Sequence, residues 1–165
     1  MNARPQEKPH RLPPECYRGQ VAVAFTACLL EGQTGLNRAS VVSPFVKFLG
    51  RVGTKHACLV LIYCFMPDHL HVIVHGREDL SDTRQAMVDF KQLSGFWFRS
   101  VKSPLRWQKD FYDHIIRKEQ DLGAQVRYVA ANPVRRKLAQ DWRHYPHTGS
   151  IGVDLETAIS NSLTL

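Results

Sequence analysis

The sequence contains no hydrophobic stretch long enough to cross a membrane. The longest apolar run, residues 57–67, is about half the length that a membrane-spanning helix needs. The segment 1–14 is polar and proline-rich, which is unlike a secretory signal peptide. These features predict a soluble, cytoplasmic protein.

Cysteine is scarce, and its spacing is not that of a zinc or redox motif. The four cysteines, of which three lie in apolar surroundings, form no C-x-x-C pair. Cys16, Cys28, Cys58 and Cys64 are therefore predicted to be reduced thiols that act as small core residues.

Negative charge is also scarce. The chain has 15 acidic against 22 basic side chains, which gives a net charge of +7. A positive surplus of this size favours an anionic partner, most often a nucleic acid, although a merely basic soluble protein would have the same composition.

The order of the patterned segments predicts one α+β domain. Strand-length apolar runs occupy residues 20–30, 56–65, 69–75 and about 112–117. Helical spacing occurs at residues 37–50, from 81 to the residues before Pro104, and at 119–132. The order β-α-β-β-α-β followed by a helix is the ferredoxin-like arrangement. We expect a four-stranded antiparallel sheet with two helices on one face and an extra C-terminal helix, which carries Tyr128, across the other.

Local signals set the expected boundaries. Pro44 is awkward inside a helix, so the first helix is expected to start near Ser43 with Pro44 in its first position. Ser81 or Asp82 is a suitable N-cap for the second helix. We expect a flexible arm at residues 1–16, a catalytic domain at 17–142 and a basic, aromatic tail at 143–165.

Two histidines on one expected strand form half of a candidate metal site. His69 and His71 in M-P-D-H-L-H-V-I-V-H project from the same strand face because they are two residues apart. Paired imidazoles suit a divalent metal. His75 lies further along the same face, where it is a less favoured candidate for supporting the site or contacting DNA.

The last predicted helix supplies the second half of the candidate site. Its apolar side chains are expected to face the core, and its polar side chains form the opposite face. This polar face consists of Asp121, Gln125, Tyr128 and Asn132. Tyr128 should therefore present its hydroxyl outside the local core. The helix should end near Asn132, because Pro133 disfavours helical geometry in the residue before it.

The end of this helix is suited to charged partners. The partial negative charge of a helix C-terminus favours a cation, so Asn132 is a candidate third, oxygen-donating metal ligand. The basic run at 135–137 suits phosphate contacts, although it would also suit a solvated surface.

These parts predict phosphodiester chemistry. A metal held by His69, His71 and a carbonyl oxygen can polarise a phosphate as a Lewis acid. Tyr128, once deprotonated, can form a covalent phosphotyrosine that conserves the energy of the cleaved bond for rejoining. Tyr112, in the fourth predicted strand, is a rival nucleophile.

Two motifs together resemble a known family. M-P-D-H-L-H-V-I-V at 66–74 and Y-V-A-A-N-P-V-R-R-K-L at 128–138 are similar to the HUH single-tyrosine transposases, and most similar to the REP-associated tyrosine transposase branch. The segment W-Q-K-D-F-Y-D-H-I-I-R at 107–117 also resembles that branch, and the resemblance covers about residues 17–142.

The resemblance implies a bacterial, cytoplasmic protein that is nucleoid-associated when on DNA. Such proteins cleave and rejoin single-stranded DNA at palindromic hairpins beside a short guide sequence, with Mg²⁺ or Mn²⁺. Cleavage leaves a 5′-phosphotyrosyl enzyme and a free 3′-OH. By motif position, Tyr128 is the nucleophile, and the metal ligands are His69, His71 and Asn132. The candidate DNA-binding residues are Arg127, Arg135, Arg136, Lys137, Arg143 and His114.

Two features depart from the family pattern. The insertion-sequence branch has glutamine at the position of Asn132. The first expected strand, V-A-V-A-F-T-A, is more apolar than the family pattern, which would fit a different sheet face or a dimer contact. Insertion-sequence members are dimers that exchange the tyrosine helix, whereas REP-associated members can act as monomers. The resemblance therefore leaves both a monomer and a homodimer open.

Two other functions compete with the transposase hypothesis. A catalytically silent hairpin DNA- or RNA-binding protein would keep the fold, but the intact His69, His71 and Tyr128 argue against it. A small-molecule metalloenzyme would need an acidic ligand set, which the sequence lacks, and the basic charge argues against it as well.

Overall fold

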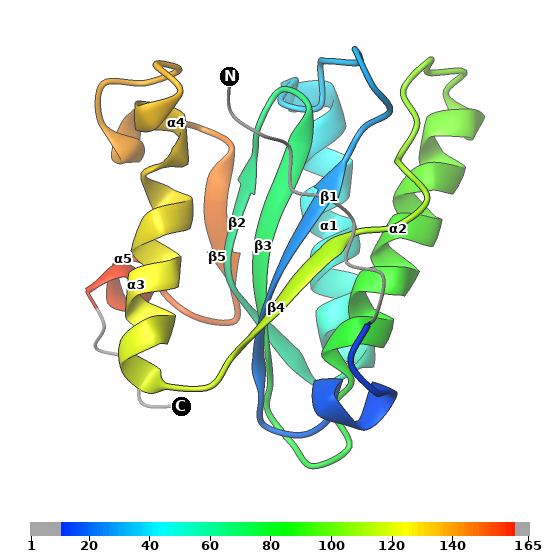
Figure 1. Ribbon diagram of the computed structural model, residues 1–165. Coiled ribbons are helices and arrows are strands. Elements are labelled where there is room, and N and C mark those ends of the chain that lie inside the picture. Colours follow the sequence, from blue (N-terminus) through cyan, green and yellow to red (C-terminus); the bar gives the residue numbers. More distant parts are fainter. Residues whose placement is uncertain (1–10, 161–165) are drawn as a thin grey trace.

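The computed structural model describes residues 11–160, with the backbone alone for Glu119 and Gln120 (Figure 1). Its middle layer is an antiparallel sheet with the strand order β4-β1-β3-β2-β5. The strands are β1 (Ala22–Cys28), β2 (Cys58–Phe65), β3 (His69–Gly76), β4 (Tyr112–Ile116) and β5 (Thr148–Ile151). The larger helices are α1 (Ala39–Lys55), α2 (Thr83–Ser100) and α3 (Glu119–Ala130). Helices α1 and α2 cover one face of the sheet and α3 lies on the other, which confirms the predicted α+β class.

Short elements complete the described chain. They are the 3₁₀ helices η1 (Pro14–Tyr17) and η2 (Trp142–His144) and the α-helices α4 (Asn132–Arg135) and α5 (Leu155–Ile159). Across residues 11–160, the helices are all too short or too polar to cross a membrane.

The sheet has five strands rather than the four expected. Its first four strands have the ferredoxin-like order, and β5 adds an edge strand by pairing with β2. A four-residue strand carries too little alternation to be distinguished from a loop in the sequence, and its partner lies far away along the chain. The helix of Tyr128, α3, is accordingly not the C-terminal element, because α4, β5 and α5 follow it.

Helix α1 begins earlier than predicted. It starts at Ala39, so Pro44 lies inside the helix and not in its first position. The missing N–H of Pro44 removes one hydrogen bond, to the carbonyl of Ser40 in the first turn. Val41 and Phe45 are buried from this part of the helix, and their burial offsets the lost bond. The predicted N-cap of α2 is confirmed, since the Asp82 carboxylate accepts a hydrogen bond from the Gln85 amide.

Two apolar cores lie on opposite sides of the sheet, because alternate residues of a strand face opposite sides. The core beneath α1 and α2 is rich in aromatic rings, including Phe25, Phe45, Phe65, Phe90 and Phe98. The core beneath α3 is aliphatic and includes Leu61, Ile62, Ile73, Leu122 and Val126. Strand β1 lies inside the sheet between β4 and β3, so the apolar character of its sequence follows from packing within one chain.

Candidate active site

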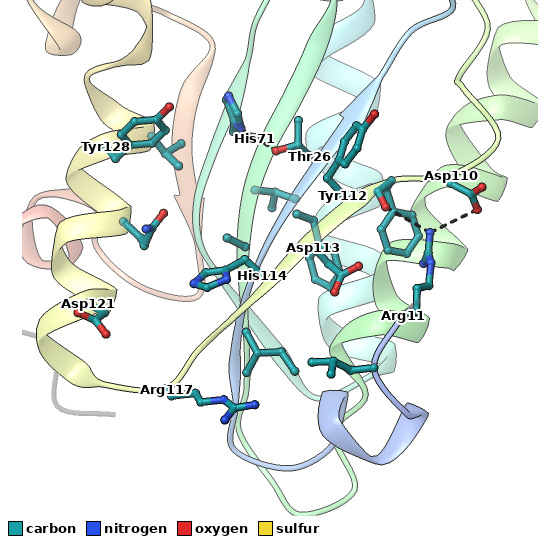
Figure 2. A pocket seen from close by; sticks show the side chains of 18 of the residues that line it. Arg11, Thr26, His71, Asp110, Tyr112, Asp113, His114, Arg117, Asp121 and Tyr128 are labelled. Carbon is teal, nitrogen blue, oxygen red and sulfur yellow. Dashed lines mark hydrogen bonds and ion pairs between the residues drawn. The ribbon is translucent and has the colours of Figure 1, made fainter. Parts of the chain in front are cut away.

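A groove of about 1370 Å³ lies between α3 and the β1–β4 side of the sheet (Figure 2). Ala24 and Thr26 of β1 contribute to its lining together with His71 of β3. Small side chains at these β1 positions leave room beneath α3. The remaining lining includes Tyr112 and His114 from β4, and Asp121, Gln125 and Tyr128 from α3.

Strand register brings side chains from three strands into one row. Thr26 pairs with His71 on one side and with Tyr112 on the other. Directly paired residues place their side chains on the same sheet face. The face that carries His71 therefore also carries Thr26 and Tyr112, and all three lie on the α3 side.

His69 and His71 converge through their Nε2 atoms, which are 3.1 Å apart. The Nδ1 atom of His69 lies 2.7 Å from the Asp68 carboxylate, and Nδ1 of His71 lies 3.0 Å from the Thr26 hydroxyl. With a proton on each Nδ1, both Nε2 lone pairs are free and point to a shared space. This geometry fits a divalent metal held by both Nε2 atoms, and metal binding itself stays a prediction.

His71 is kept in its neutral form. Burial lowers its pKa to about 3, and the nearby His69 ring and the positive charges of Arg135 and Arg136 contribute in the same direction, against the opposite effect of Asp68. A neutral imidazole retains the lone pair that a metal ligand needs. The same interactions place Arg135, the last residue of α4, and Arg136, which follows it, within electrostatic reach of His71.

Tyr128 projects from the last turn of α3 into the groove that His71 also lines (Figure 2). Its side chain is 52% exposed. The opposite side of α3 is buried as predicted, through Leu122, Val126, Val129 and Ala130. The division of the helix into an apolar core face and a polar groove face is thus observed for Asp121, Gln125 and Tyr128.

The rival tyrosine, Tyr112, faces the same groove from β4. Tyr112 and His71 are the two neighbours of Thr26, so they are two strands apart. Because adjacent strands are about 4.8 Å apart, their backbones are separated by about 10 Å. Both tyrosines therefore remain candidates on position alone.

Asn132 departs from the exposed position expected for the polar face. It is 5% exposed and is the first residue of α4, while α3 ends two residues earlier at Ala130. Its Oδ1 accepts a hydrogen bond of 3.2 Å from Arg135, and its buried Nδ2 has no partner within residues 11–160. An amide oxygen has a second lone pair, so a role as metal ligand is still compatible with this bond.

Acidic or thiol ligands do not complete the histidine pair. Within the part of the chain that the structure describes, no three His, Cys, Asp or Glu side chains gather into a metal-binding cluster. Asn132 remains the predicted third ligand. His75 is buried, its Nδ1 has no partner among the described residues, and burial lowers its pKa, but it does not line the groove.

The predicted DNA-binding residues fall into two groups by position. His114 lines the groove, and the basic run that follows Asn132 lies at the α3–α4 end, where Arg135, Arg136 and Lys137 are exposed. Arg127 instead donates a hydrogen bond of 3.4 Å to the carbonyl of Ile159, the last residue of α5.

Arg143 is similarly engaged away from the groove. Its guanidinium forms ion pairs of 3.6 Å with Asp141 and with Glu156 of α5, and it lies over the Trp142 ring. Arg127 therefore connects α3 to α5, and Arg143 connects η2 to α5. Their role in DNA binding stays a prediction.

Sequence reasoning did not identify the two groups that orient the imidazoles. Asp68 directly precedes His69, and Thr26 carries the single hydroxyl within residues 20–30. A hydroxyl in an otherwise apolar strand was the available signal for Thr26. Its pairing with His71 follows from strand order, which local sequence does not display.

The sequence is similar to one curated protein over about half of its length. No protein-family model matches the chain. The chain is 27% identical over 94 residues to a Haemophilus influenzae protein that is assigned by its name to the REP-associated tyrosine transposases. This match covers 48% of the chain and 53% of the relative, so the chain spans about half the length of the curated relative.

The structural comparison covers more of the chain. A REP-associated tyrosine transposase bound to a REP hairpin superimposes with a TM-score of 0.72 over 87% of this chain and 82% of that chain, at 19% identity. The chain resembles the REP-associated tyrosine transposases in sequence and in fold.

Proposed function

We propose that this chain is a transposase-like enzyme that cleaves and rejoins single-stranded DNA at hairpins through a 5′-phosphotyrosyl intermediate on Tyr128. The observation that carries the proposal is the shared groove into which Tyr128 and His71 both open. The positive charges of Arg135 and Arg136 act at the same place, as their effect on the pKa of His71 indicates. A nucleophile, an imidazole pair and phosphate-compatible charge are the components that phosphodiester transfer requires.

Hairpin DNA is the proposed partner. The net charge of +7 favours a polyanion, and the structural relative is itself bound to a REP hairpin. The groove offers the rings of Tyr112 and His114 for base stacking, and the cations of Arg117 and Lys118 for the backbone.

Mg²⁺ or Mn²⁺ is the proposed cofactor, held by His69 and His71 with Asn132 as third ligand. When bound, the ion would supply Lewis-acid polarisation of the scissile phosphate. The contribution of the chain is to prepare the ligands. Asp68 and Thr26 orient the two rings, and burial keeps His71 neutral.

Tyr128 is the proposed nucleophile. Its phenol proton passes to solvent, to which half of the side chain is exposed. The phenolate oxygen then bonds to phosphorus while the bond from phosphorus to the 3′ oxygen breaks, and that oxygen takes up a proton to become the 3′-OH. The 5′ phosphate stays on Tyr128 until a 3′-OH of another strand reverses the exchange.

A covalent-adduct assay tests the proposal. Labelled hairpin DNA is incubated with Mn²⁺ and the protein, and the adduct is detected on a denaturing gel. We expect an adduct with the wild type and with Tyr112→Phe, and none with Tyr128→Phe despite retained DNA binding. Loss of the adduct in Tyr112→Phe, with the adduct retained in Tyr128→Phe, would identify Tyr112 on β4 as the nucleophile. Hairpin binding by a wild type that forms no adduct would indicate the catalytically silent binding protein.

A further inference from the structure

A single guanidinium connects the candidate nucleophile to the candidate third ligand. The Cζ atom of Arg135 lies 3.8 Å from the centre of the Tyr128 ring. Its Nη2 group donates to the main-chain carbonyl of Tyr128 at 3.3 Å and to the side-chain oxygen of Asn132 at 3.2 Å. We propose that Arg135 is a positioning residue that clamps the Tyr128 ring in the groove, an inference that rests on the proposed function of Tyr128.

Tyr128 needs such a clamp because little else fixes its ring. The side chain is 52% exposed, and in residues 11–160 its hydroxyl makes no hydrogen bond. An exposed tyrosine on a helix can change between side-chain rotamers. A guanidinium stacked on the ring restricts that exchange, because it attracts the negative face of the aromatic system.

The α3–α4 junction explains why Arg135 reaches the ring. The Ala131 amide bonds to the Arg127 carbonyl, and the Arg135 amide bonds to the Ala131 carbonyl, so the helical path continues through Asn132. Residues seven apart on such a path lie on the same side, two turns away from each other. Arg135 thus returns to the face from which Tyr128 projects.

Arginine chemistry suits this combination of contacts. The planar guanidinium stacks on a ring and donates in its plane at the same time, whereas the ammonium of lysine is a compact point charge. Replacement of Arg135 by lysine would therefore keep the charge and remove the clamp. The effect of the charge and the effect of the contact to the ring can therefore be separated experimentally.

Arg136 is the matched control. It is the next residue in the chain, it is exposed, and its charge lowers the pKa of His71 as that of Arg135 does. Within the described residues it does not stack on Tyr128. Arg135→Lys and Arg136→Lys consequently make the same chemical change at adjacent positions, and only the first alters the contact to the nucleophile.

The first measurement separates DNA binding from adduct formation. The rate of adduct formation is measured at saturating hairpin DNA and Mn²⁺, and the DNA dissociation constant is measured by fluorescence anisotropy. We expect Arg135→Lys to slow adduct formation about ten- to a hundredfold with the dissociation constant changed less than about threefold, because a displaced nucleophile lowers the rate at full occupancy. Arg136→Lys should slow adduct formation far less than Arg135→Lys does, because the Arg136 guanidinium does not stack on the Tyr128 ring. Equal rates in the two variants would overturn the proposal.

The second measurement does not depend on catalysis. The 165-residue chain is labelled with 3-fluorotyrosine at its five tyrosines, and the ¹⁹F NMR signal of Tyr128 is assigned by its loss in Tyr128→Phe. We expect Arg135→Lys to move and sharpen this signal towards that of a freely rotating tyrosine, with the other four signals unchanged. Arg136→Lys should leave it in place.

These readouts distinguish two kinds of failure. An unchanged Tyr128 signal in Arg135→Lys would show that the guanidinium does not hold the ring. If the wild type forms no adduct with any hairpin, the proposed function fails, and the fluorine signal alone then decides whether the clamp exists.

Discussion

His69 and His71 meet edge to face, with an angle of 84° between their rings and 3.1 Å between their Nε2 atoms. The strand alone places both rings on one face of the sheet. Asp68 and Thr26 then hold the Nδ1 atoms and turn the Nε2 atoms towards each other. The pair is therefore oriented by one group from strand β1 and one from the loop between β2 and β3.

Removing one of these orienting groups should weaken metal binding. Thr26→Val keeps the shape of the side chain and deletes the hydroxyl beside His71. We expect Mn²⁺ affinity, measured by isothermal titration calorimetry, to fall about tenfold, since outer partners of a ligand histidine typically contribute this much. Thr148→Val is the control, because Thr148 lies on the edge strand β5 and its hydroxyl donates to the Cys64 sulfur and not to a histidine. Equal affinity in wild type and Thr26→Val would contradict the assigned role.

The groove should contribute to binding of single-stranded DNA. His114→Ala removes an exposed ring from the β4 wall. We expect the dissociation constant for a hairpin with a single-stranded flank to rise about tenfold, since stacking of one base contributes about 1–3 kcal/mol. His144→Ala, at an exposed histidine of η2 outside the groove, should have no effect. A similar loss in both variants would argue for general charge and against the groove.

Asp89 should stabilise the fold in a pH-dependent way. Burial opposes its ionisation, but hydrogen bonds from Lys55, His56 and Gln85 outweigh burial and lower its pKa to about 2. A depressed carboxyl pKa stabilises the folded state above the ordinary value near 4, and this contribution is lost as the pH falls towards 2. Asp89→Asn should lower the free energy of unfolding by about 1–2 kcal/mol at pH 7.

Thermal unfolding followed by circular dichroism measures this effect. The difference between wild type and Asp89→Asn should shrink as the pH is lowered from 4 to 2, because protonation removes the same charge from the wild type. Asp79→Asn, at an exposed turn, is the control and should leave the unfolding temperature unchanged. A difference that stays constant down to pH 2 would contradict the pKa of Asp89.

The end of strand β3 should tolerate no side chain at Gly76. A Cβ at this position would collide with the main-chain oxygen of Gly19 and approach the Ser81 Cβ to 2.8 Å. We expect Gly76→Ala to reduce stability by about 1–3 kcal/mol in urea unfolding, because a backbone oxygen cannot move aside cheaply. Gly50→Ala on α1, where a Cβ would make only an ordinary contact of 3.9 Å, should be neutral or slightly stabilising. Equal stability of both variants would refute the steric argument.

Local patterns predicted much of the fold. The long strands β2 and β3 and the helices α2 and α3 begin and end within a few residues of their expected positions, because the strands are apolar runs of strand length and the helices carry a clear helical period. The start of α1 was wrong because burial of Val41 and Phe45 outweighs the cost of Pro44. Strand β5 was missed because its pairing with β2 is non-local.

The sequence by itself determined which chemical groups are present and on which face of each element they lie. Period two placed His69 and His71 together on a strand, and period 3.6 placed Tyr128 opposite the buried side of its helix. Tertiary structure decided how these elements meet. Strand order set Thr26 beside His71, and the packing of α3 brought Tyr128 to the same groove. The turn into α4 buried Asn132 and returned Arg135 to the tyrosine ring. These contacts depend on register and packing between distant segments, which no local period encodes.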